Sequence, residues 1–342
     1  MAPHLRVRVE GTGVAAAALA ALLARRGLAV ALARGAQGPE RIVAIPQATV
    51  ALLNELLAID VARDVRGRDV TGRCVAWEER RAVAVNAPAF VCDVRDVVAA
   101  IVAGLPRSVV AEHPAMPECD WTIVARGRGE GDRGLAAGER VAAVGVVDAL
   151  PGFDATRTFV AAVDDGWLFA APHPAAGVAL ALVQPPERAT GPALAALNAA
   201  IDALWPAHRA SLAAAATRVR AAPWLDLDGA RPGRLCVGDS AFAVDPLRGD
   251  GVGFAVRGAL LAQAALCAIA SEGRAGPYLA HYSARLRHAF RRHVGECIDH
   301  YGSAWNAPIW DGEIARMQRC RAAAAAAPAL RFRLDGLDLV PA

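Results

Sequence analysis

The stretch GDSAFAVDPLRGDGVGFAVRGALLAQAA, residues 238–265, decides the fold of this chain. It follows an apolar run, residues 235–237, that is typical of a strand, and its last part has the small and apolar pattern of a helix. Between them lie Asp239, an Asp-Pro pair and three glycines at alternate positions. Such a turn leaves backbone N–H groups open at the start of a helix, where the helix dipole favours negative charge. Asp239 is placed to accept hydrogen bonds from sugar-like hydroxyls.

Another glycine turn, the first along the chain, lies near its start. Residues 5–10 alternate apolar and Arg side chains as a strand does, and Gly11-Thr-Gly13-Val-Ala-Ala16 follows at once. An alanine-rich helix up to Arg26 and a strand over 28–32 complete a βαβ unit. Gly11 and Gly13 allow a tight turn and the close approach of a pyrophosphate, and Ala16 lets the helix pack on the strand.

The full string at 238–265 resembles the second flavin-binding motif of FAD-dependent monooxygenases of the p-hydroxybenzoate hydroxylase type. Flavin-dependent halogenases and geranylgeranyl reductases are relatives of these enzymes. The resemblance implies an α/β fold, with a Rossmann-like FAD-binding domain, an inserted β-sheet substrate domain and a helical C-terminus. It also implies FAD as the cofactor, with Asp239 on the ribityl chain. Pro246, Gly249, Gly251 and the helix start at Val252 would lie against the isoalloxazine ring.

The adenosine side departs from this pattern. The second strand should end in Glu or Asp, which holds the adenosine ribose, but Ala33 stands there, followed by Arg34. In the segment 119–127, Val124 stands where relatives carry an acid, although Gly127 keeps the turn. Each missing charge-assisted hydrogen bond costs up to roughly 1.5–3 kcal/mol of binding free energy.

Two further arginines are assigned to the cofactor site by resemblance. Residues 41–57 predict a helix that starts near Pro46; relatives have a Gly-Glu pair ahead of it, and Arg41 is what remains here. Asp93-Val-Arg95 begins another helix, similar to a segment whose Arg lies near the flavin. A solvent-facing helix arginine is the alternative for Arg95. The predicted cofactor site thus includes Arg34, Arg41, Arg95 and Gly127.

Two segments, one in the middle and one near the end of the chain, resemble a particular subgroup of these flavoproteins. Residues 164–172 are similar to a substrate-domain strand of tryptophan halogenases and of flavoproteins that hydroxylate tryptophan during maturation of peptidyl quinone cofactors. Residues 301–310 match the closing segment of the same group. Trp167 and Phe169 share one face of a strand, so they line a substrate pocket by resemblance or form sheet core.

These assignments predict a discontinuous domain organisation. The FAD-binding domain would comprise residues 1–70, 93–137 and 223–272, and the substrate domain residues 71–92 and 138–222. Residues 273–342 would form a helical C-terminal region that ends in a loose tail.

Composition narrows the function classes. The net charge of +3 gives no reason to expect nucleic acid or an anionic membrane as a partner. Seven dispersed cysteines, without a C-x-x-C pair, fit reduced thiols, and no uninterrupted apolar run reaches a membrane span. We therefore expect a cytoplasmic protein. The spacing of the histidines in residues 281–300 does not predict a metal site.

The favoured hypothesis is an FAD-dependent monooxygenase. By resemblance, it would hydroxylate an aromatic small molecule, or tryptophan in a peptide or protein, through a flavin C4a-hydroperoxide. A separate flavin reductase is one expected source of electrons, since no nicotinamide-binding motif is apparent. Halogenases rely on an active-site lysine, and all 37 Lys and Arg residues here are Arg. The alternative is a non-catalytic scaffold that keeps the fold for partner binding, because the adenosine side is eroded.

Overall fold

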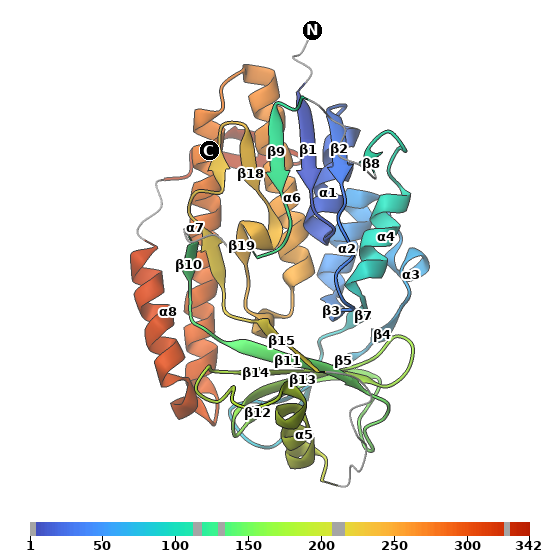
Figure 1. Ribbon diagram of the computed structural model, residues 1–342, viewed down its shortest axis with the longest axis vertical. Coiled ribbons are helices and arrows are strands. Elements are labelled where there is room, and N and C mark those ends of the chain that lie inside the picture. Colours follow the sequence, from blue (N-terminus) through green and yellow to red (C-terminus); the bar gives the residue numbers. More distant parts are fainter. Residues whose placement is uncertain (1–4, 112–117, 129–133, 207–215, 325–328) are drawn as a thin grey trace.

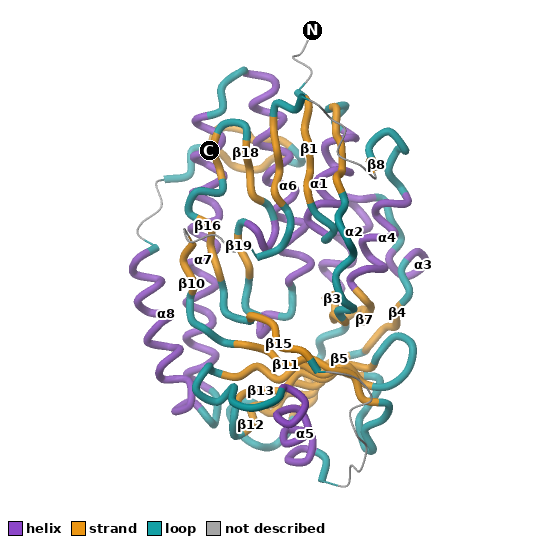
Figure 2. Tube along the Cα trace, viewed as in Figure 1, coloured by secondary structure: helices purple, strands orange, loops and turns teal. Residues whose placement is uncertain are grey.

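The computed structural model of the 342-residue chain describes residues 5–111, 118–128, 134–206, 216–324 and 329–342. Two large sheets lie at opposite ends of the protein (Figure 1). One is mostly parallel, and the other is mostly antiparallel. Two three-stranded sheets lie between them, and long helices run alongside (Figure 2).

The first large sheet has the strand order β17-β18-β9-β1-β2-β8. All neighbouring strands are parallel except the β17–β18 hairpin. The carboxyl ends of its parallel strands therefore meet at one edge, which faces the second large sheet (Figure 1). The strands are β1 Arg6–Glu10, β2 Ala29–Ala33, β8 Val110–Ala111, β9 Trp121–Val124, β17 Ala230–Arg231 and β18 Arg234–Cys236.

The predicted βαβ unit is confirmed by β1, α1 (Val14–Arg25) and β2. Val7 and Val9 are fully buried and alternate with arginines along β1, as the sequence pattern requires. In α1 the residues from Val14 to Leu23 are all buried. Their mostly small side chains allow α1 to pack closely against both the sheet and α6 (Gly251–Glu272).

Helix α6 continues past residue 265, where the helix-like stretch of the sequence analysis ends, to Glu272. It is also long and apolar enough to cross a membrane by length and composition. However, 61% of its apolar stretch is buried inside the protein, where Val256, Ala259 and Ala262 contribute to the core shared with α1. Its apolar character is therefore that expected of a core helix.

The second large sheet has the order β15-β11-β14-β13-β12-β5-β6. Helix α5 (Ala193–Leu204) covers one face through Leu197 and Ile201. The opposite face carries Trp167 and packs against the C-terminal helices. The strands are β5 Gly72–Ala76, β6 Val83–Val85, β11 Val141–Val147, β12 Arg157–Val163, β13 Gly166–Pro172, β14 Val178–Gln184 and β15 Thr217–Arg220.

The helix predicted to start near Pro46 is confirmed, since α2 begins at Gln47. The residues before it, Ile42–Pro46, form β3, which pairs with β7 in the first small sheet and which the sequence analysis did not predict. The β-branched run favours a strand, and the residue before a proline avoids helical geometry. The elements of this region are β4 Gly67–Val70, β7 Ala89–Asp93, α2 Gln47–Leu57, α3 Val61–Asp64 and α4 Val94–Ala103. Helix α4 begins after Asp93, as predicted.

The remaining elements are β10, β16 and β19 of the second small sheet and the C-terminal segments. Their bounds are β10 Gly134–Ala136, β16 Trp224–Asp226, β19 Phe242–Ala243, α7 Gly276–Ser303, η3 Ala307–Trp310, α8 Asp311–Ala323, β20 Phe332–Asp335 and β21 Asp338–Pro341.

The expectation of a loose tail is wrong. Strands β20 and β21 form a hairpin that packs on α6, and Gly336 takes a positive φ of 58° at its turn. The Gln263 side chain donates to the Leu337 carbonyl oxygen at 3.3 Å, and Arg26 pairs with Asp338 at 2.5 Å.

The predicted domain boundaries stay a prediction. Strand β5 joins the second large sheet through β12, whereas β7 pairs with β3 and β4. The predicted substrate segment 71–92 thus contributes to two different sheets.

Candidate functional site

The start of the stretch 238–265 lies in contact with the start of α1. Gly238 begins the 3-10 helix η1 (Gly238–Ser240) after β18, and Ala15 lies in the first turn of α1. Gly238 has a φ of 62°, and a β-carbon there would lie 2.5 Å from the β-carbon of Ala15. A larger residue would separate the two segments. Strands β1, β9 and β18 are consecutive and parallel in the sheet, so the segments that follow β1 and β18 share one edge of it.

The first turn has the features of a phosphate-binding helix start. A β-carbon on Gly11 would lie 2.1 Å from the Ala125 carbonyl oxygen, so the turn packs directly against the loop after β9. A β-carbon on Gly13 would meet nothing within 4 Å, and no side chain caps α1. Ala16 is fully buried, as its predicted packing role requires. The N–H groups at the start of α1 are therefore open to a ligand.

Asp239 follows Gly238, the residue that lies against the start of α1. It is half-buried, and within the described residues no hydrogen bond or ion pair occupies its oxygens. The Ser240 hydroxyl donates to the Gly127 carbonyl oxygen at 2.6 Å, which fixes the adjacent loop. Arg128 is held by carbonyl oxygens of Ala222 and Val244; burial lowers its pKa, and the Asp239 charge opposes that shift. Asp239 can thus accept hydrogen bonds from hydroxyl groups of a ligand.

The second turn exposes its backbone at the start of α6. Pro246 begins the short 3-10 helix η2 (Pro246–Arg248), and Gly249 follows with a φ of 66°. Asp250 caps α6 by accepting from the Gly253 N–H at 3.2 Å. Pro246 and Gly251 are exposed, whereas Val252 is buried. A flat ring could approach this turn without meeting a side chain from Gly251.

A fully buried charged network supports the second turn from behind. Arg140 Nε donates to Asp245 Oδ2 at 3.0 Å, and its guanidinium also pairs with Glu313. The side chains of all three residues have no solvent exposure. Asp245 in turn accepts from the Leu247 N–H at 2.9 Å, at the start of η2. The network therefore links the second turn to the residue just before β11 and to helix α8.

Aromatic and histidine side chains complete this support. The Tyr301 hydroxyl donates to the Asp245 carboxylate at 3.2 Å and accepts from Trp167 Nε1 at 3.1 Å. The Asp245 N–H donates to His293 Nε2 at 2.8 Å, so the Nε2 atom of His293 carries no proton. Sequence reasoning missed Arg140, His293 and Glu313, because their partners lie far along the chain.

The protonation states in this network follow from burial and from pairing. Burial opposes the charge of Arg140, but the Asp245 and Glu313 carboxylates raise its pKa further than burial lowers it. Burial also raises the pKa of Tyr301 well above its usual range, and Asp245 adds to that shift. Burial lowers the pKa of His293 to about 4, so His293 is neutral at pH 7.

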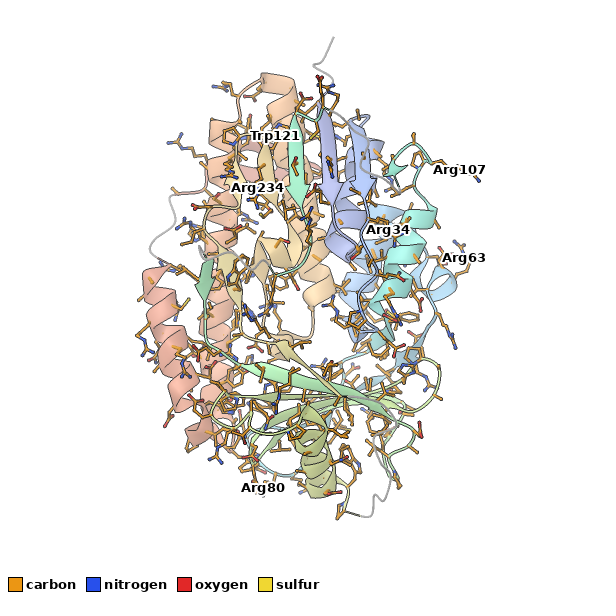
Figure 3. All side chains as sticks on the ribbon, in the orientation of Figure 1. Arg34, Arg63, Arg80, Arg107, Trp121 and Arg234 are labelled. Carbon is orange, nitrogen blue, oxygen red and sulfur yellow. The ribbon has the colours of Figure 1, made fainter. Side chains whose placement is uncertain are left out.

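The end of β2, where the resemblance would place the adenosine, is built differently. Ala33 ends β2 and lies opposite Glu10 in the parallel ladder. The Glu10 carboxylate is occupied by Arg8, at 3.1 Å, and by Arg126, at 2.7 Å. Arg34 is half-buried, and within the described residues its guanidinium has no hydrogen bond or ion pair. Figure 3 places Arg34 just beyond the end of β2, toward the middle of the protein, far from Arg80 at the opposite end.

The structure does not join Arg41 and Arg95 to the glycine turns. Both backbone N–H groups donate to Asp93 Oδ1, at 3.3 and 3.0 Å. The Arg95 side chain pairs with Asp93 and with Glu40, whose carboxylate also lies 3.3 Å from His173 Nε2. Arg41 is exposed. These residues form a separate cluster at the start of α4, so their contact with the cofactor stays a prediction.

Trp167 and Phe169 share the face of the second sheet that is directed away from α5. Trp167 is 2% exposed and packs in the core with Tyr301 and Trp310. Phe169 is only partly buried. Phe169 is therefore more accessible to a substrate than Trp167, and a pocket role for the two residues stays a prediction.

The residues of the two glycine turns fit an FAD molecule better than the residues at the end of β2 do. At Gly13 and Gly251 the space that a side chain would take is open, and Asp239 has a free carboxylate. These residues can hold the pyrophosphate, the ring and the ribityl chain. At Ala33 no carboxylate is present for the adenosine ribose.

No known protein-family profile matches the chain, and no curated protein sequence does. Solved structures do match. The structure of QhpG, a peptidyl tryptophan dihydroxylase essential for tryptophylquinone cofactor biogenesis, has a TM-score of 0.79 and 23% identity, over 99% of this chain and 86% of that one. The myxobacterial chondrochloren halogenase CndH has a TM-score of 0.72 and 19% identity, over 94% and 90%.

A third similar structure is that of PqsL, a probable FAD-dependent monooxygenase from Pseudomonas aeruginosa. Its TM-score is 0.62 and its identity 16%, over 93% of this chain and 99% of that one. The chain therefore has the fold of FAD-dependent monooxygenases and halogenases, which confirms the predicted fold class.

Proposed function

We propose that this protein is an FAD-dependent monooxygenase that hydroxylates an aromatic substrate, with tryptophan in a peptide as the specific candidate. The observation that carries the proposal is the contact between Gly238 and Ala15, which joins the two turns into one surface. This surface carries the uncapped N–H groups at the start of α1, and it also carries Asp239, whose carboxylate has no hydrogen bond or ion pair within the described residues. The fold similarity to QhpG, which acts on peptidyl tryptophan, supports the specific candidate.

Each part of the surface has a role in this proposal. The N–H groups at the start of α1 would bind the pyrophosphate, and Asp239 would accept hydrogen bonds from ribityl hydroxyls. The Gly251 and Val252 amides would face negative charge on the ring. FAD, when bound and reduced, supplies the redox chemistry with molecular oxygen. The packed side chains of Trp167, Tyr301 and Trp310 exclude water behind the second turn.

A flavin-free scaffold is the second candidate, because a specific observation favours it. Ala33 offers no carboxylate, and the nearby Glu10 is neutralised by Arg8 and Arg126. A halogenase is a weaker candidate. By resemblance, halogenases need an active-site lysine, and this chain has none; a guanidinium stays protonated and does not replace it.

The electron source and the compartment are also part of the proposal. We propose that a separate reductase supplies reduced flavin, because the chain shows no second dinucleotide motif. A reducing, cytoplasmic compartment is supported by the seven cysteines, all of which are free thiols.

The test is single-turnover oxidation. The protein is loaded with FAD, reduced without oxygen, mixed with a tryptophan-containing peptide or with a small aromatic compound, and then exposed to oxygen. An oxygen atom added to either substrate, detected by mass spectrometry, supports the proposal. If FAD is bound and both substrates return unmodified, the monooxygenase proposal fails. If no FAD binds, the scaffold is favoured.

A further inference from the structure

A continuous series of aromatic rings leads from the second glycine turn toward the protein surface. It begins at Tyr301, whose hydroxyl donates to the Asp245 carboxylate at 3.2 Å, directly before the turn at Pro246. Trp167 Nε1 donates to the same hydroxyl at 3.1 Å. The ring centroid of Trp77 lies 6.3 Å from that of Trp167 and 6.5 Å from that of Tyr301. We call these three rings the aromatic path.

The aromatic path runs from the interior to the surface. Tyr301 is fully buried and Trp167 almost fully buried, whereas Trp77 is partly exposed. Trp77 stands directly before the exposed residue Glu78, and its Nε1 donates to the His300 carbonyl oxygen at 2.8 Å. A small reductant in solution can therefore reach the outer end of the path.

The inner end has the chemistry that electron transfer from a tyrosine requires. Tryptophan and tyrosine are among the side chains from which one electron is most easily removed. Removing an electron from tyrosine makes its phenolic proton strongly acidic, so a base within hydrogen-bond distance is needed. Asp245 is such a base, since its fully buried carboxylate accepts from the Tyr301 hydroxyl. Burial and the Asp245 charge raise the pKa of Tyr301, so the hydroxyl keeps its proton until the ring is oxidised.

Two neighbouring tryptophans do not offer an equal route. Trp310 has its ring centroid 4.4 Å from that of Tyr301, but it is fully buried and gives no access to the surface. The Trp305 N–H donates to the Trp77 carbonyl oxygen at 2.9 Å, so Trp305 lies beside the outer end. However, the Arg80 guanidinium stacks over the Trp305 ring at 3.9 Å, and a cation there opposes the removal of an electron. Trp77 is therefore the favoured outer end.

We propose that the aromatic path carries single electrons from the surface to the second turn, where they quench an oxidant that has not reached a substrate. This inference rests on the proposed function, because bound flavin and oxygen would supply that oxidant. It goes further, since it assigns a protective electron-transfer function to buried residues that hydroxylation itself does not require.

The proposed steps balance in electrons and protons. One electron leaves the Tyr301 ring for the oxidant, and the phenolic proton moves to Asp245, which leaves a neutral tyrosyl radical and a protonated carboxyl group. An electron from Trp77 then passes by way of Trp167 to Tyr301, and the proton returns from Asp245 to the hydroxyl. The oxidised Trp77 ring is restored by one electron from a soluble reductant such as ascorbate.

The first experiment places the oxidant at the second turn. FAD-loaded protein without substrate or oxygen is illuminated with blue light, which makes the bound flavin a one-electron oxidant, and is then frozen for electron paramagnetic resonance. The wild type should show a tyrosyl radical. Tyr301→Phe, which keeps the ring contacts but lacks the hydroxyl, should lose that signal.

The two other tyrosines of the chain supply the matched controls. Tyr278 and Tyr282 are also buried, but among the described residues no tryptophan ring contacts either of them. The radical should therefore persist in Tyr278→Phe and in Tyr282→Phe. A radical that survives in Tyr301→Phe would lie on another residue and would overturn the inference.

The second experiment tests the outer end. Trp77→Phe keeps a ring at this position, but phenylalanine is much harder to oxidise. Its tyrosyl radical should form under light as in the wild type and should decay several-fold more slowly when ascorbate is added. Trp305→Phe is the control and should decay like the wild type. Equal decay in Trp77→Phe and the wild type would contradict the proposed route.

A third experiment separates failure of this inference from failure of the proposed function. Photo-oxidised ruthenium tris(bipyridine), a one-electron oxidant in solution, is applied to protein without added FAD. It should give the same tyrosyl radical through Trp77, and both Trp77→Phe and Tyr301→Phe should lose it. If FAD does not bind, the proposed function fails, and this radical alone decides whether the path conducts. If FAD binds and light gives no radical that depends on Tyr301, the inference is wrong.

Discussion

The second glycine turn and the end of β2 differ in how their charged side chains are held. At the second turn the charges are buried and paired with one another. At the end of β2 the charged side chains are partly exposed, and Ala33 offers no carboxylate. Behind the second turn, Arg140, Asp245 and Glu313 have no solvent exposure. At the end of β2, the position proposed for the adenosine, Ala33 is flanked by Arg34 and by the Glu10–Arg126 pair, in which the Arg126 side chain is 67% exposed. Buried, paired side chains support the second turn, whereas the end of β2 has no such support.

This difference indicates where the binding free energy for a flavin would come from. A preorganised site loses little entropy when it binds its ligand. We therefore expect the ribityl and ring parts of FAD to contribute most of the affinity, and the adenosine part to contribute little. The predictions below test that asymmetry.

The largest effect is expected at the ribityl contact. Asp239→Ala should weaken FAD binding by more than about 100-fold, because two charge-assisted hydrogen bonds of roughly 1.5–3 kcal/mol each would be lost. Quenching of flavin fluorescence measures the affinity. Asp148→Ala removes an exposed carboxylate at the end of β11 and should have no effect. Equal affinities of wild type and Asp239→Ala would remove the role of Asp239.

The buried network should dominate stability at the second turn. Arg140→Met would leave the Asp245 and Glu313 carboxylates buried without their partner, at a cost of about 3–5 kcal/mol in the free energy of unfolding. Chemical denaturation measures it. Arg316→Met is the control, since Arg316 pairs with the same Glu313 at 3.0 Å but is partly exposed, and it should cost less than about 1 kcal/mol. Similar losses in both variants would contradict the picture of a rigid turn.

The pH dependence of stability should report on His293. Its pKa is about 4 in the folded protein, against an ordinary value of 6.5. As the pH falls from 6.5 to 4, the unfolded chain takes up a proton that the folded protein does not, so stability falls through this window. The loss is about 3 kcal/mol, at roughly 1.4 kcal/mol per pKa unit.

His293→Gln is the variant that isolates this effect. Glutamine can still accept from the Asp245 N–H, and it does not titrate. Its free energy of unfolding should depend less on pH between 6.5 and 4 than that of the wild type. His281, whose pKa is also lowered by burial, is common to both proteins. Identical pH profiles would show that His293 is not buried in its neutral form.

The smallest expected effect is a gain in FAD affinity at the end of β2. Ala33→Glu supplies the missing carboxylate and should tighten FAD binding about 10-fold, the equivalent of one charge-assisted hydrogen bond. Ala33→Gln has a similar size without the charge and should gain less. The affinities are compared by fluorescence titration. If Ala33→Glu gains nothing, the adenosine does not lie at the end of β2.

The features that the sequence could predict are local. Gly11, Gly13 and Gly249 lie in strings of a few residues whose turn geometry follows from the residue types. The missed features depend on partners far apart in the chain. Arg140 meets Asp245 and Glu313 over separations of 105 and 173 residues. A charged residue in a strand of alternating polarity is predicted to be solvent-exposed. The pattern does not reveal which other elements pack over that face of the strand.

The hairpin of β20 and β21 teaches the same lesson. Its residues alternate weakly and carry charges, so composition suggested a loose tail. The hairpin is held by α6 and by the Arg26–Asp338 pair, which only the folded chain brings together.

The most direct test of the central claim, that the two turns form one flavin site, is uptake of FAD by the purified protein. The protein is mixed with excess FAD, passed through a desalting column and examined by absorption spectroscopy. We predict that the protein fraction carries bands at roughly 375 and 450 nm, as expected of bound oxidised flavin. A colourless protein fraction, with all of the flavin in the small-molecule fraction, would contradict the claim.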